Sequence, residues 1–256
     1  MEGGEAAVFR LKSADPLRRV YQSLLELLYP RGSHCLCCGH PRLADTTDCL
    51  CDACREEIRR LRVPSEACDR CLMPVRKGHP CAFCQSPLMK PIQAVYAPYR
   101  YGGAVRQLIH AFKFGACDEA HPLLSHAMAE SLKDRDFDCL VPVPLHPRRE
   151  RERGCNQALL LCRDLSAQTG IPVRELLRRD TYRRPQSRLP LRKRQANVSG
   201  AFSCRESPAD LRVLLVDDVR TSGSTACACA KALKQAGAKS VSLCVCAVVY
   251  RKKPSN

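Results

Sequence analysis

Residues 213–225 read VLLVDDVRTSGST, and this stretch decides the fold expected for the chain. The four apolar residues at 213–216 are typical of a strand buried on both faces of a parallel sheet. The periodicity becomes helical over residues 226–236, and Gly237 ends that segment. The turn between them therefore lies at the carboxyl end of a strand and the amino end of a helix. Unpaired backbone N–H groups and the positive end of the helix dipole favour a phosphate group there.

Polar side chains in the same stretch extend this prediction to a sugar phosphate. The carboxylates of Asp217 and Asp218 can each accept hydrogen bonds from vicinal hydroxyls. Four hydroxyl side chains can donate to phosphate oxygens: Thr221, Ser222, Ser224 and Thr225. An ordinary turn with an N-cap serine and a surface pair of aspartates would explain any one of these features alone. Their combination in one run predicts a ribose-5-phosphate site instead.

The stretch resembles the phosphoribosyl-pyrophosphate (PRPP) signature of the type I phosphoribosyltransferases. Further segments look like successive landmarks of the ComF family, the phosphoribosyltransferase-like proteins of bacterial natural competence: VPVPLH at 141–146, RGCNQ at 153–157, Gln186 with Arg194, and NVSGAF at 197–202. With the cysteine-rich front end, the resemblance covers about residues 24–250. Two positions depart from the family pattern, which usually has an aromatic residue at 155 and Thr-Thr-Gly at 221–223. Here they are Cys155 and Thr-Ser-Gly.

The resemblance implies a role for each matching residue. Asp217 and Asp218 would hold the ribose 2′- and 3′-hydroxyls, and the following loop would wrap the 5′-phosphate: Val219, Arg220, Thr221, Ser222, Gly223, Ser224 and Thr225. The loop after an earlier strand would bind pyrophosphate through His146 and Arg153. Arg194, on a basic flexible loop, would meet the pyrophosphate leaving group and act with the two aspartates in catalysis. A mixed-charge helix is the alternative for residues 148–153.

Basic residues dominate the chain, with 42 Lys and Arg against 26 Asp and Glu and a net charge of +16. Such a charge favours an anionic partner. Residues 178–194 contain eight basic side chains and Asp180 as their only acid, without apolar periodicity, so we expect a loop or hairpin there. These charges can neutralise PRPP or a nucleic-acid backbone, because each contact with a phosphate releases a counterion. A merely solvated charge run is the plainer alternative.

Nineteen cysteines include four Cys-x-x-Cys pairs, all near the amino end. Two such turns complete the four-sulfur set that Zn²⁺ prefers, so the spacing predicts two structural zinc sites made by successive pairs. Interleaved pairing, a single occupied site and a redox role for one pair stay open. Sites of this kind hold a fold together and leave no position open for catalysis. The eight candidate ligands are Cys35, Cys38, Cys51, Cys54, Cys68, Cys71, Cys81 and Cys84.

The predicted architecture is an α/β phosphoribosyltransferase-type parallel sheet with helices on both faces, plus a small zinc-ribbon-like module. We expect an N-terminal helix within 1–33, the cysteine-rich module at 34–90 and the phosphoribosyltransferase-like domain at 91–256. The expected strands are residues 94–101, 139–143, 213–216 and 241–248, and the expected helices are residues 54–61, 103–114, 156–169 and 224–236.

Two functions from different classes follow. The resemblance implies a competence protein that binds PRPP or a related ribose phosphate and single-stranded DNA, alongside the competence helicase and other DNA-uptake proteins. The alternative is an active phosphoribosyltransferase that transfers ribose-5-phosphate from PRPP, with Mg²⁺, to an unidentified acceptor. With no Trp, 6 Phe and 7 Tyr, strand binding would rest mainly on phosphate contacts.

The sequence also predicts where the protein works. No stretch approaches the roughly 20 apolar residues of a membrane span. The first residues lack the basic segment of a secretory signal. We therefore expect a cytoplasmic protein without a membrane span.

Overall fold

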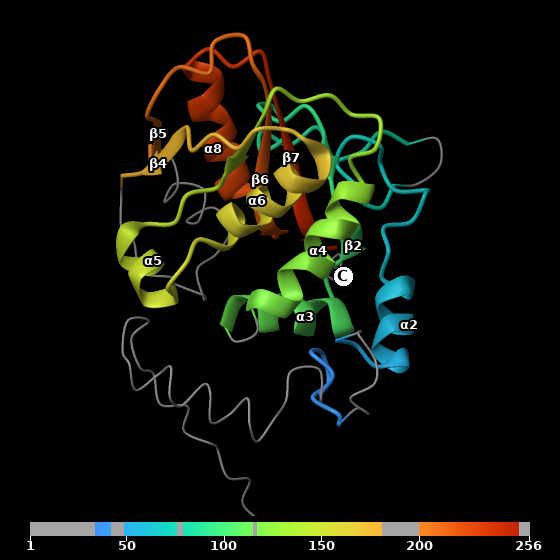
Figure 1. Ribbon diagram of the computed structural model, residues 1–256. Coiled ribbons are helices and arrows are strands. Elements are labelled where there is room, and N and C mark those ends of the chain that lie inside the picture. Colours follow the sequence, from blue (N-terminus) through green and yellow to red (C-terminus); the bar gives the residue numbers. More distant parts are fainter. Residues whose placement is uncertain (1–33, 42–48, 76–78, 115–116, 181–199, 251–256) are drawn as a thin grey trace, which may run out of the picture.

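A computed structural model describes residues 34–41, 49–75, 79–114, 117–180 and 200–250 (Figure 1). The predicted N-terminal helix within 1–33 lies outside the described residues. The same holds for Gln186, Arg194 and most of the predicted basic loop.

A five-stranded parallel sheet forms the centre of the molecule (Figure 1). Its order is β1 (Val95–Tyr96), β7 (Ser240–Val248), β6 (Arg212–Arg220) and β3 (Cys139–Pro142), and β2 (Tyr99–Arg100) also pairs with β7. The expected strand at 94–101 is thus two short strands. Pro98 separates them, and a proline has no N–H to donate to a sheet.

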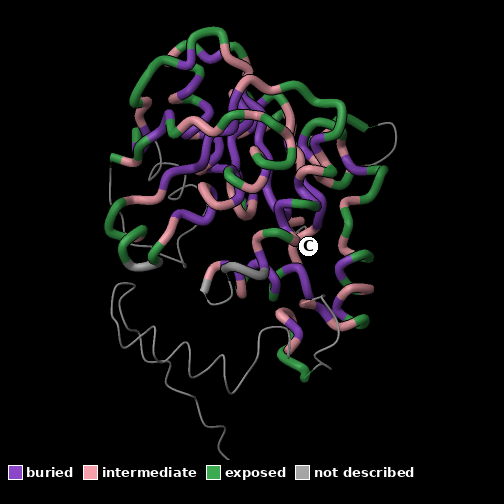
Figure 2. Tube along the Cα trace, viewed as in Figure 1, coloured by how far each residue is buried: buried purple, intermediate pink, exposed green. Residues whose placement is uncertain are grey.

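Helices cover both faces of the sheet, as predicted. One face packs against α3 (Gly103–Phe114), α4 (Cys117–Glu130) and α6 (Gln157–Thr169), and the other packs against α8 (Ser224–Gln235). Along β6, Leu214 and Val216 enter the first core, whereas Val213 and Leu215 enter the second. Successive strand side chains point to opposite faces, so an unbroken apolar run is what a doubly covered strand needs. Figure 2 shows the sheet as the most buried part of the trace.

Several elements differ from the expectation. Helix α4 was not predicted, and Pro122 lies inside it. Residues 147–153 form helix α5 (Pro147–Arg153), which is the mixed-charge alternative. The predicted basic loop is flanked by an antiparallel pair of strands, β4 (Leu177–Arg179) and β5 (Phe202–Cys204).

The cysteine-rich segment packs on both cores of the sheet. Helix α2 (Asp52–Arg60) lies beside the start of α3, where a Cβ at position 103 would collide with the Glu57 carboxylate, so Gly103 permits this approach. Residues Cys35 and Ile58 join the first core, and Cys71 and Met89 join the second. The division into domains stays a prediction.

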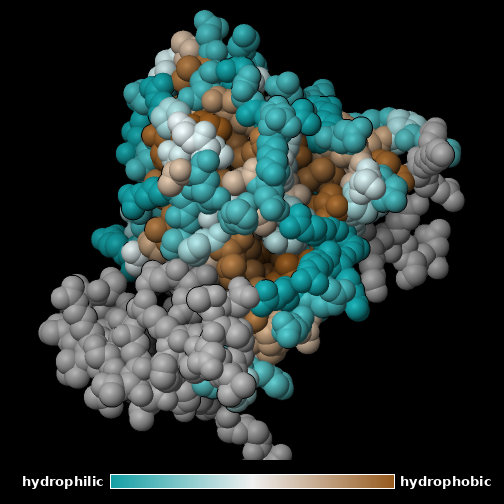
Figure 3. Space-filling view, turned by 45° about the vertical axis from the view of Figure 1, so that its right-hand side comes forward, coloured by the Kyte–Doolittle hydropathy of each residue, from teal (hydrophilic) through white to brown (hydrophobic). Residues whose placement is uncertain are grey.

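Two properties of the described residues bear on partners. None of their helices combines the length and apolarity needed to cross a bilayer. Figure 3 shows hydrophilic residues over much of the described face in view, with apolar residues in the recesses between them.

Candidate functional site

The carboxyl ends of β3 and β6 lie next to each other, because Pro142 pairs with Val216. Two carboxylates follow at once on β6, Asp217 and Asp218, and both residues are half-buried. Polar groups that end adjacent parallel strands gather at one edge of the sheet, which is where open α/β folds bind ligands. This edge is therefore the candidate functional site.

The two carboxylates have different neighbours. Asp218 forms an ion pair with Lys113 near the end of α3, with 2.6 Å between Nζ and Oδ2. Asp217 accepts a hydrogen bond from the Asp218 backbone N–H at 2.9 Å. Alternation along the strand directs Asp218 toward α3 and Asp217 toward α8. A ribose that contacts both acids would have to lie across the end of β6.

The turn after β6 has the geometry of a helix start. Gly223 is the N-cap of α8 with a φ of +79°, a conformation that favours glycine. The hydroxyls of Ser222 and Ser224 are buried and lie 2.9 Å apart, and Ser222 Oγ also accepts the Ser224 N–H at 3.3 Å. Thr221 is exposed. The buried serines thus shape the turn, and α8 begins at the same edge, where the first N–H groups of a helix have no partner within the helix.

The predicted pyrophosphate residues follow β3. His146 is the N-cap of α5, and its Nδ1 accepts the Arg148 N–H at 3.2 Å. Asn156 fixes the loop by donating to the Val143 carbonyl at 3.3 Å. Arg153 ends α5, but its side chain is not among the described atoms. The roles of His146, Arg153 and Arg194 stay predictions.

The sequence reasoning missed one cation at this edge, Lys113, and included the other, Arg179, only as part of the predicted basic loop. Lys113 carries no local signal, because only folding brings α3 to the end of β6. Arg179 lies over the Phe202 ring at 5.4 Å, and burial lowers the pKa of its guanidinium. A cavity of about 90 Å³ lies between α5 and β4, and Arg178, Arg179 and Arg205 line it with Glu150 and Glu175.

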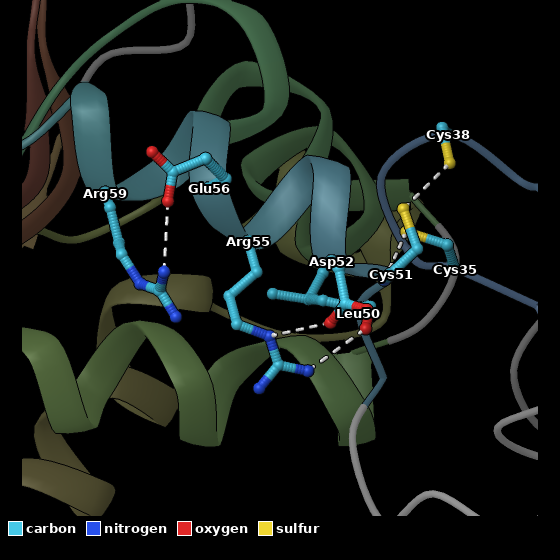
Figure 4. Close-up of polar contacts among 8 residues, drawn as sticks. All are labelled: Cys35, Cys38, Leu50, Cys51, Asp52, Arg55, Glu56 and Arg59. Carbon is cyan, nitrogen blue, oxygen red and sulfur yellow. Dashed lines mark hydrogen bonds and ion pairs between the residues drawn. The ribbon is translucent and has the colours of Figure 1, made fainter.

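The first cysteine tetrad consists of Cys35, Cys38, Cys51 and Cys54, whose sulfurs all lie within 4.8 Å of one another. Figure 4 shows Cys38 reaching toward Cys51, with 3.7 Å between their sulfurs. The Cys51 N–H donates to the Cys35 sulfur at 3.3 Å. Burial raises the pKa of Cys35, but backbone hydrogen bonds outweigh it and lower the pKa to about 6.

The second cysteine tetrad consists of Cys68, Cys71, Cys81 and Cys84, also within 4.8 Å of one another. Its sulfurs lie 3.6 Å apart for Cys68 and Cys84 and 3.4 Å apart for Cys71 and Cys81. Burial raises the pKa of Cys68, yet hydrogen bonds from the Cys71 and Arg70 backbone lower it to about 7.

Both tetrads are fit to bind zinc. A tetrahedral site with Zn–S bonds of about 2.3 Å has sulfurs about 3.8 Å apart, close to the separations in both tetrads. The grouping is of successive pairs, and all eight cysteines have free thiols. Neither tetrad is interleaved. The number of bound ions stays a prediction.

Comparison with known proteins relates this site to a family. A family model described as the phosphoribosyl transferase domain matches residues 157–255. The DNA utilization protein YhgH of Salmonella typhi is 32% identical over 208 residues, covering 77% of this chain and 89% of that protein. Competence protein ComFC of Streptococcus pneumoniae is 26% identical over 220 residues, covering 81% of this chain and 96% of that protein.

A third relative has a shorter match. Competence protein F of Haemophilus influenzae is 36% identical over 108 residues, covering 41% of this chain and 47% of that protein. The resemblance predicted from the sequence is confirmed, and so is the phosphoribosyltransferase-type fold with two cysteine tetrads. The chain belongs to the ComF family.

Proposed function

We propose that this protein binds PRPP or a related ribose phosphate at the carboxyl end of β6 and handles single-stranded DNA during DNA uptake. The observation that carries the first half is the succession of two carboxylates, a serine-shaped turn and a helix start at one edge of the sheet. The names of the relatives, a DNA utilization protein and a competence protein, support the second half.

The geometry suggests how a ribose phosphate would bind. Its phosphate accepts hydrogen bonds from the first N–H groups of α8, where the helix dipole is positive. Its hydroxyls donate to Asp217 and Asp218 across the strand end. Lys113 forms an ion pair with Asp218 and adds positive potential for an anionic ligand. Mg²⁺ would accompany PRPP and balance its phosphate charge.

A second candidate function is phosphoribosyl transfer, which the match to the phosphoribosyl transferase domain favours. In that reaction the bond between C1 of the ribose and the pyrophosphate oxygen breaks, pyrophosphate leaves with the bonding electrons, and an acceptor nucleophile bonds to C1. Asp217 and Asp218 would orient the ribose in the oxocarbenium-like state. Pyrophosphate release from PRPP across a panel of acceptors tests this candidate.

For DNA, exposed basic side chains lie on α5 and β4 beside the candidate site. Arg148 and Arg151 are exposed on α5, and Arg178 is exposed on β4. These residues flank the edge that holds the candidate ribose phosphate site, and residues 181–199 follow β4 in the chain. The proposed strand path therefore runs over α5 and β4.

Thermal stability with and without ribose-5-phosphate tests the sugar-phosphate site. A ligand that binds only the folded state adds about 2.7 kcal/mol at a hundredfold excess over its Kd. Asp217→Ala with Asp218→Ala should abolish this gain. The matched control is Asp134→Ala with Asp136→Ala, two exposed acids before β3, which should keep it. If Asp217→Ala with Asp218→Ala kept the full stabilisation by ribose-5-phosphate, the ribose would have to bind elsewhere.

The salt dependence of single-stranded DNA binding tests the second part of the proposal. The logarithm of the affinity for a mixed-sequence oligonucleotide should fall linearly with the logarithm of the salt concentration, by roughly 0.7 per phosphate contact on single strands. Arg148→Ala with Arg151→Ala should reduce that slope by about 1.4. Arg59→Ala with Arg60→Ala removes the same charge from α2 and should leave it unchanged. Equal slopes in all three proteins would contradict the proposed path.

A further inference from the structure

Arg220 is the only charged side chain that is buried among the described residues, with 3% of its surface exposed. It is the last residue of β6. Its Nη2 donates to the Cys71 carbonyl at 3.1 Å, and its guanidinium lies over the Phe83 ring at 4.8 Å. Its Nε and Nη1 are buried and have no hydrogen-bond partner in the part of the chain that the structure describes. A buried cation of this kind needs a compensating negative charge.

The second tetrad can supply that charge. The bond from Arg220 to the Cys71 carbonyl and its position over Phe83, which lies between Cys81 and Cys84 in the chain, put the guanidinium beside this tetrad. Four thiolates around one Zn²⁺ leave a net charge of about −2. A cation beside such a centre stabilises it in the way that outer groups tune metal sites. The guanidinium and the metal-loaded tetrad are thus electrostatically complementary.

The segment that carries this tetrad also lies against the turn that is predicted to bind phosphate. Arg220 is followed directly by Thr221, and its own carbonyl is fixed by the Val249 N–H at 3.0 Å. Phe83, between Cys81 and Cys84, lies so near the turn that a Cβ at Gly223 would be 3.8 Å from its ring. The start and the middle of the turn are therefore both held by the segment that carries the second tetrad.

We propose that Arg220 is a positioning residue that couples the second tetrad to the ribose phosphate site, so that metal held by Cys68, Cys71, Cys81 and Cys84 fixes the turn at Thr221–Gly223 for phosphate binding. The phosphate half of this inference rests on the proposed function. The metal half does not, because the counter-ion role of Arg220 concerns the tetrad alone.

The first tetrad offers a matched control in Arg55. Figure 4 shows the Arg55 side chain reaching the Leu50 carbonyl beside Cys51, at 3.4 Å from Nη2. Its Nε also lies 3.9 Å from the Asp52 carboxylate, and its side chain is 35% exposed. Arg55 thus stands near a tetrad of the same composition, but it is partly hydrated and paired with an acid.

The experiment compares Arg220→Gln, Arg220→Lys and Arg55→Gln with the wild type, each purified with zinc under reducing conditions. Zinc release to a chelator is followed with a colorimetric indicator, and ribose-5-phosphate affinity is measured by titration calorimetry. We expect Arg220→Gln to speed the release of one of two zinc ions at least tenfold and to weaken ribose-5-phosphate binding at least tenfold. Arg220→Lys, which keeps the charge, should recover most of both losses. Arg55→Gln should leave ribose-5-phosphate binding unchanged.

Each contrary result has its own meaning. Unchanged release of both ions from Arg220→Gln would overturn the counter-ion role. Faster release with unchanged ribose-5-phosphate affinity would overturn the coupling. Absence of ribose-5-phosphate binding by the wild type would overturn the proposed function and the coupling with it, while the release rates still decide the counter-ion role. If Arg220→Gln does not fold, Phe83→Leu tests the coupling, because it loosens the contact with the turn and leaves all four thiols in place.

Discussion

The two cysteine tetrads have the same composition and the same spacing within each pair, yet they lie on opposite faces of the sheet. Cys35 and Cys54 join the core beneath α3, α4 and α6. Cys71 joins the core beneath α8, beside the turn after β6. Two sites that one motif predicts as equivalent therefore have different neighbours. The motif predicts the ion, and the position in the fold decides what the ion can influence.

In the described part of the chain, the first tetrad is linked to the candidate site by helix α3. The Cys37 thiol donates to the Ala104 carbonyl at 3.3 Å, in the first turn of α3. Lys113, which pairs with Asp218, lies near the other end of that helix. A helix of this size spans roughly 18 Å at 1.5 Å per residue. The segment that carries the second tetrad contacts the turn through Phe83 and Arg220, so we expect the second tetrad to affect ligand binding far more strongly.

The largest expected effect comes from removing one ligand of each tetrad in turn, with Cys84→Ser and Cys38→Ser. Each variant should retain one zinc ion where the wild type holds two, and native mass spectrometry counts them. Both should lose stability, since structural zinc contributes about 10–16 kcal/mol in small zinc-binding peptides. Only Cys84→Ser should also lose the thermal stabilisation by ribose-5-phosphate.

Two outcomes would contradict the expected difference between the two tetrads. If both variants lose ribose-5-phosphate binding equally, the tetrads act alike through global stability. If a wild type free of metal keeps its fold and its circular dichroism spectrum, neither tetrad is structural. Working well below the melting temperature of the less stable variant separates lost binding from lost folding.

A smaller effect is expected from Lys113→Met, which removes the cation on the first tetrad's side of the site. The half-buried pair with Asp218 is broken, and the positive potential at the edge falls. We expect ribose-5-phosphate affinity to fall about tenfold, or about 1.4 kcal/mol, while both zinc ions stay bound. Lys239→Met removes an exposed lysine at the other edge of the sheet and should leave the affinity unchanged. Calorimetric titration of both variants measures the difference.

Local pattern was enough to predict much of the fold. The apolar run at 213–216 and the helical spacing at 103–114 and 226–236 recur in β6, α3 and α8. Helix α4 was missed because Pro122 interrupts its pattern, although its buried Leu124 and Met128 hold it against the sheet. Tertiary packing here overrides a helix-breaking signal that the sequence alone cannot weigh.

The candidate site was predictable only where one segment holds all of it. Asp217, Asp218 and the turn are contiguous, so their proximity follows from the sequence. Lys113 and the contact of Arg220 with Cys71 depend on how distant segments meet. The sequence groups Arg220 with the phosphate-binding residues, but its side chain is buried at the second tetrad and leaves only its backbone at the turn.

The smallest expected effect comes from the substitution Asp138→Asn at the amino end of β3. This variant serves as a baseline for the variants of both tetrads. Asp138 accepts the Arg212 backbone N–H at 2.6 Å and its guanidinium at 2.8 Å, and these bonds lower the pKa of Asp138 from 3.8 to about 2. Because the folded-state pKa is the lower one, the ionised carboxylate stabilises the fold above about pH 4. That contribution is lost as the pH falls toward 2.

At pH 7 the variant should therefore melt at most about 3 °C below the wild type, as expected for a partly exposed pair. The difference should shrink between pH 4 and pH 2. Acid also displaces metal from thiolates, but it does so in both proteins alike, so their difference isolates the carboxylate. Zinc count and ribose-5-phosphate affinity should not change at pH 7, because Asp138 lies at the opposite edge from the site. A loss of either would mean that the sheet transmits strain from edge to edge, and the contrast between a directly coupled and a remote tetrad would then lose its basis.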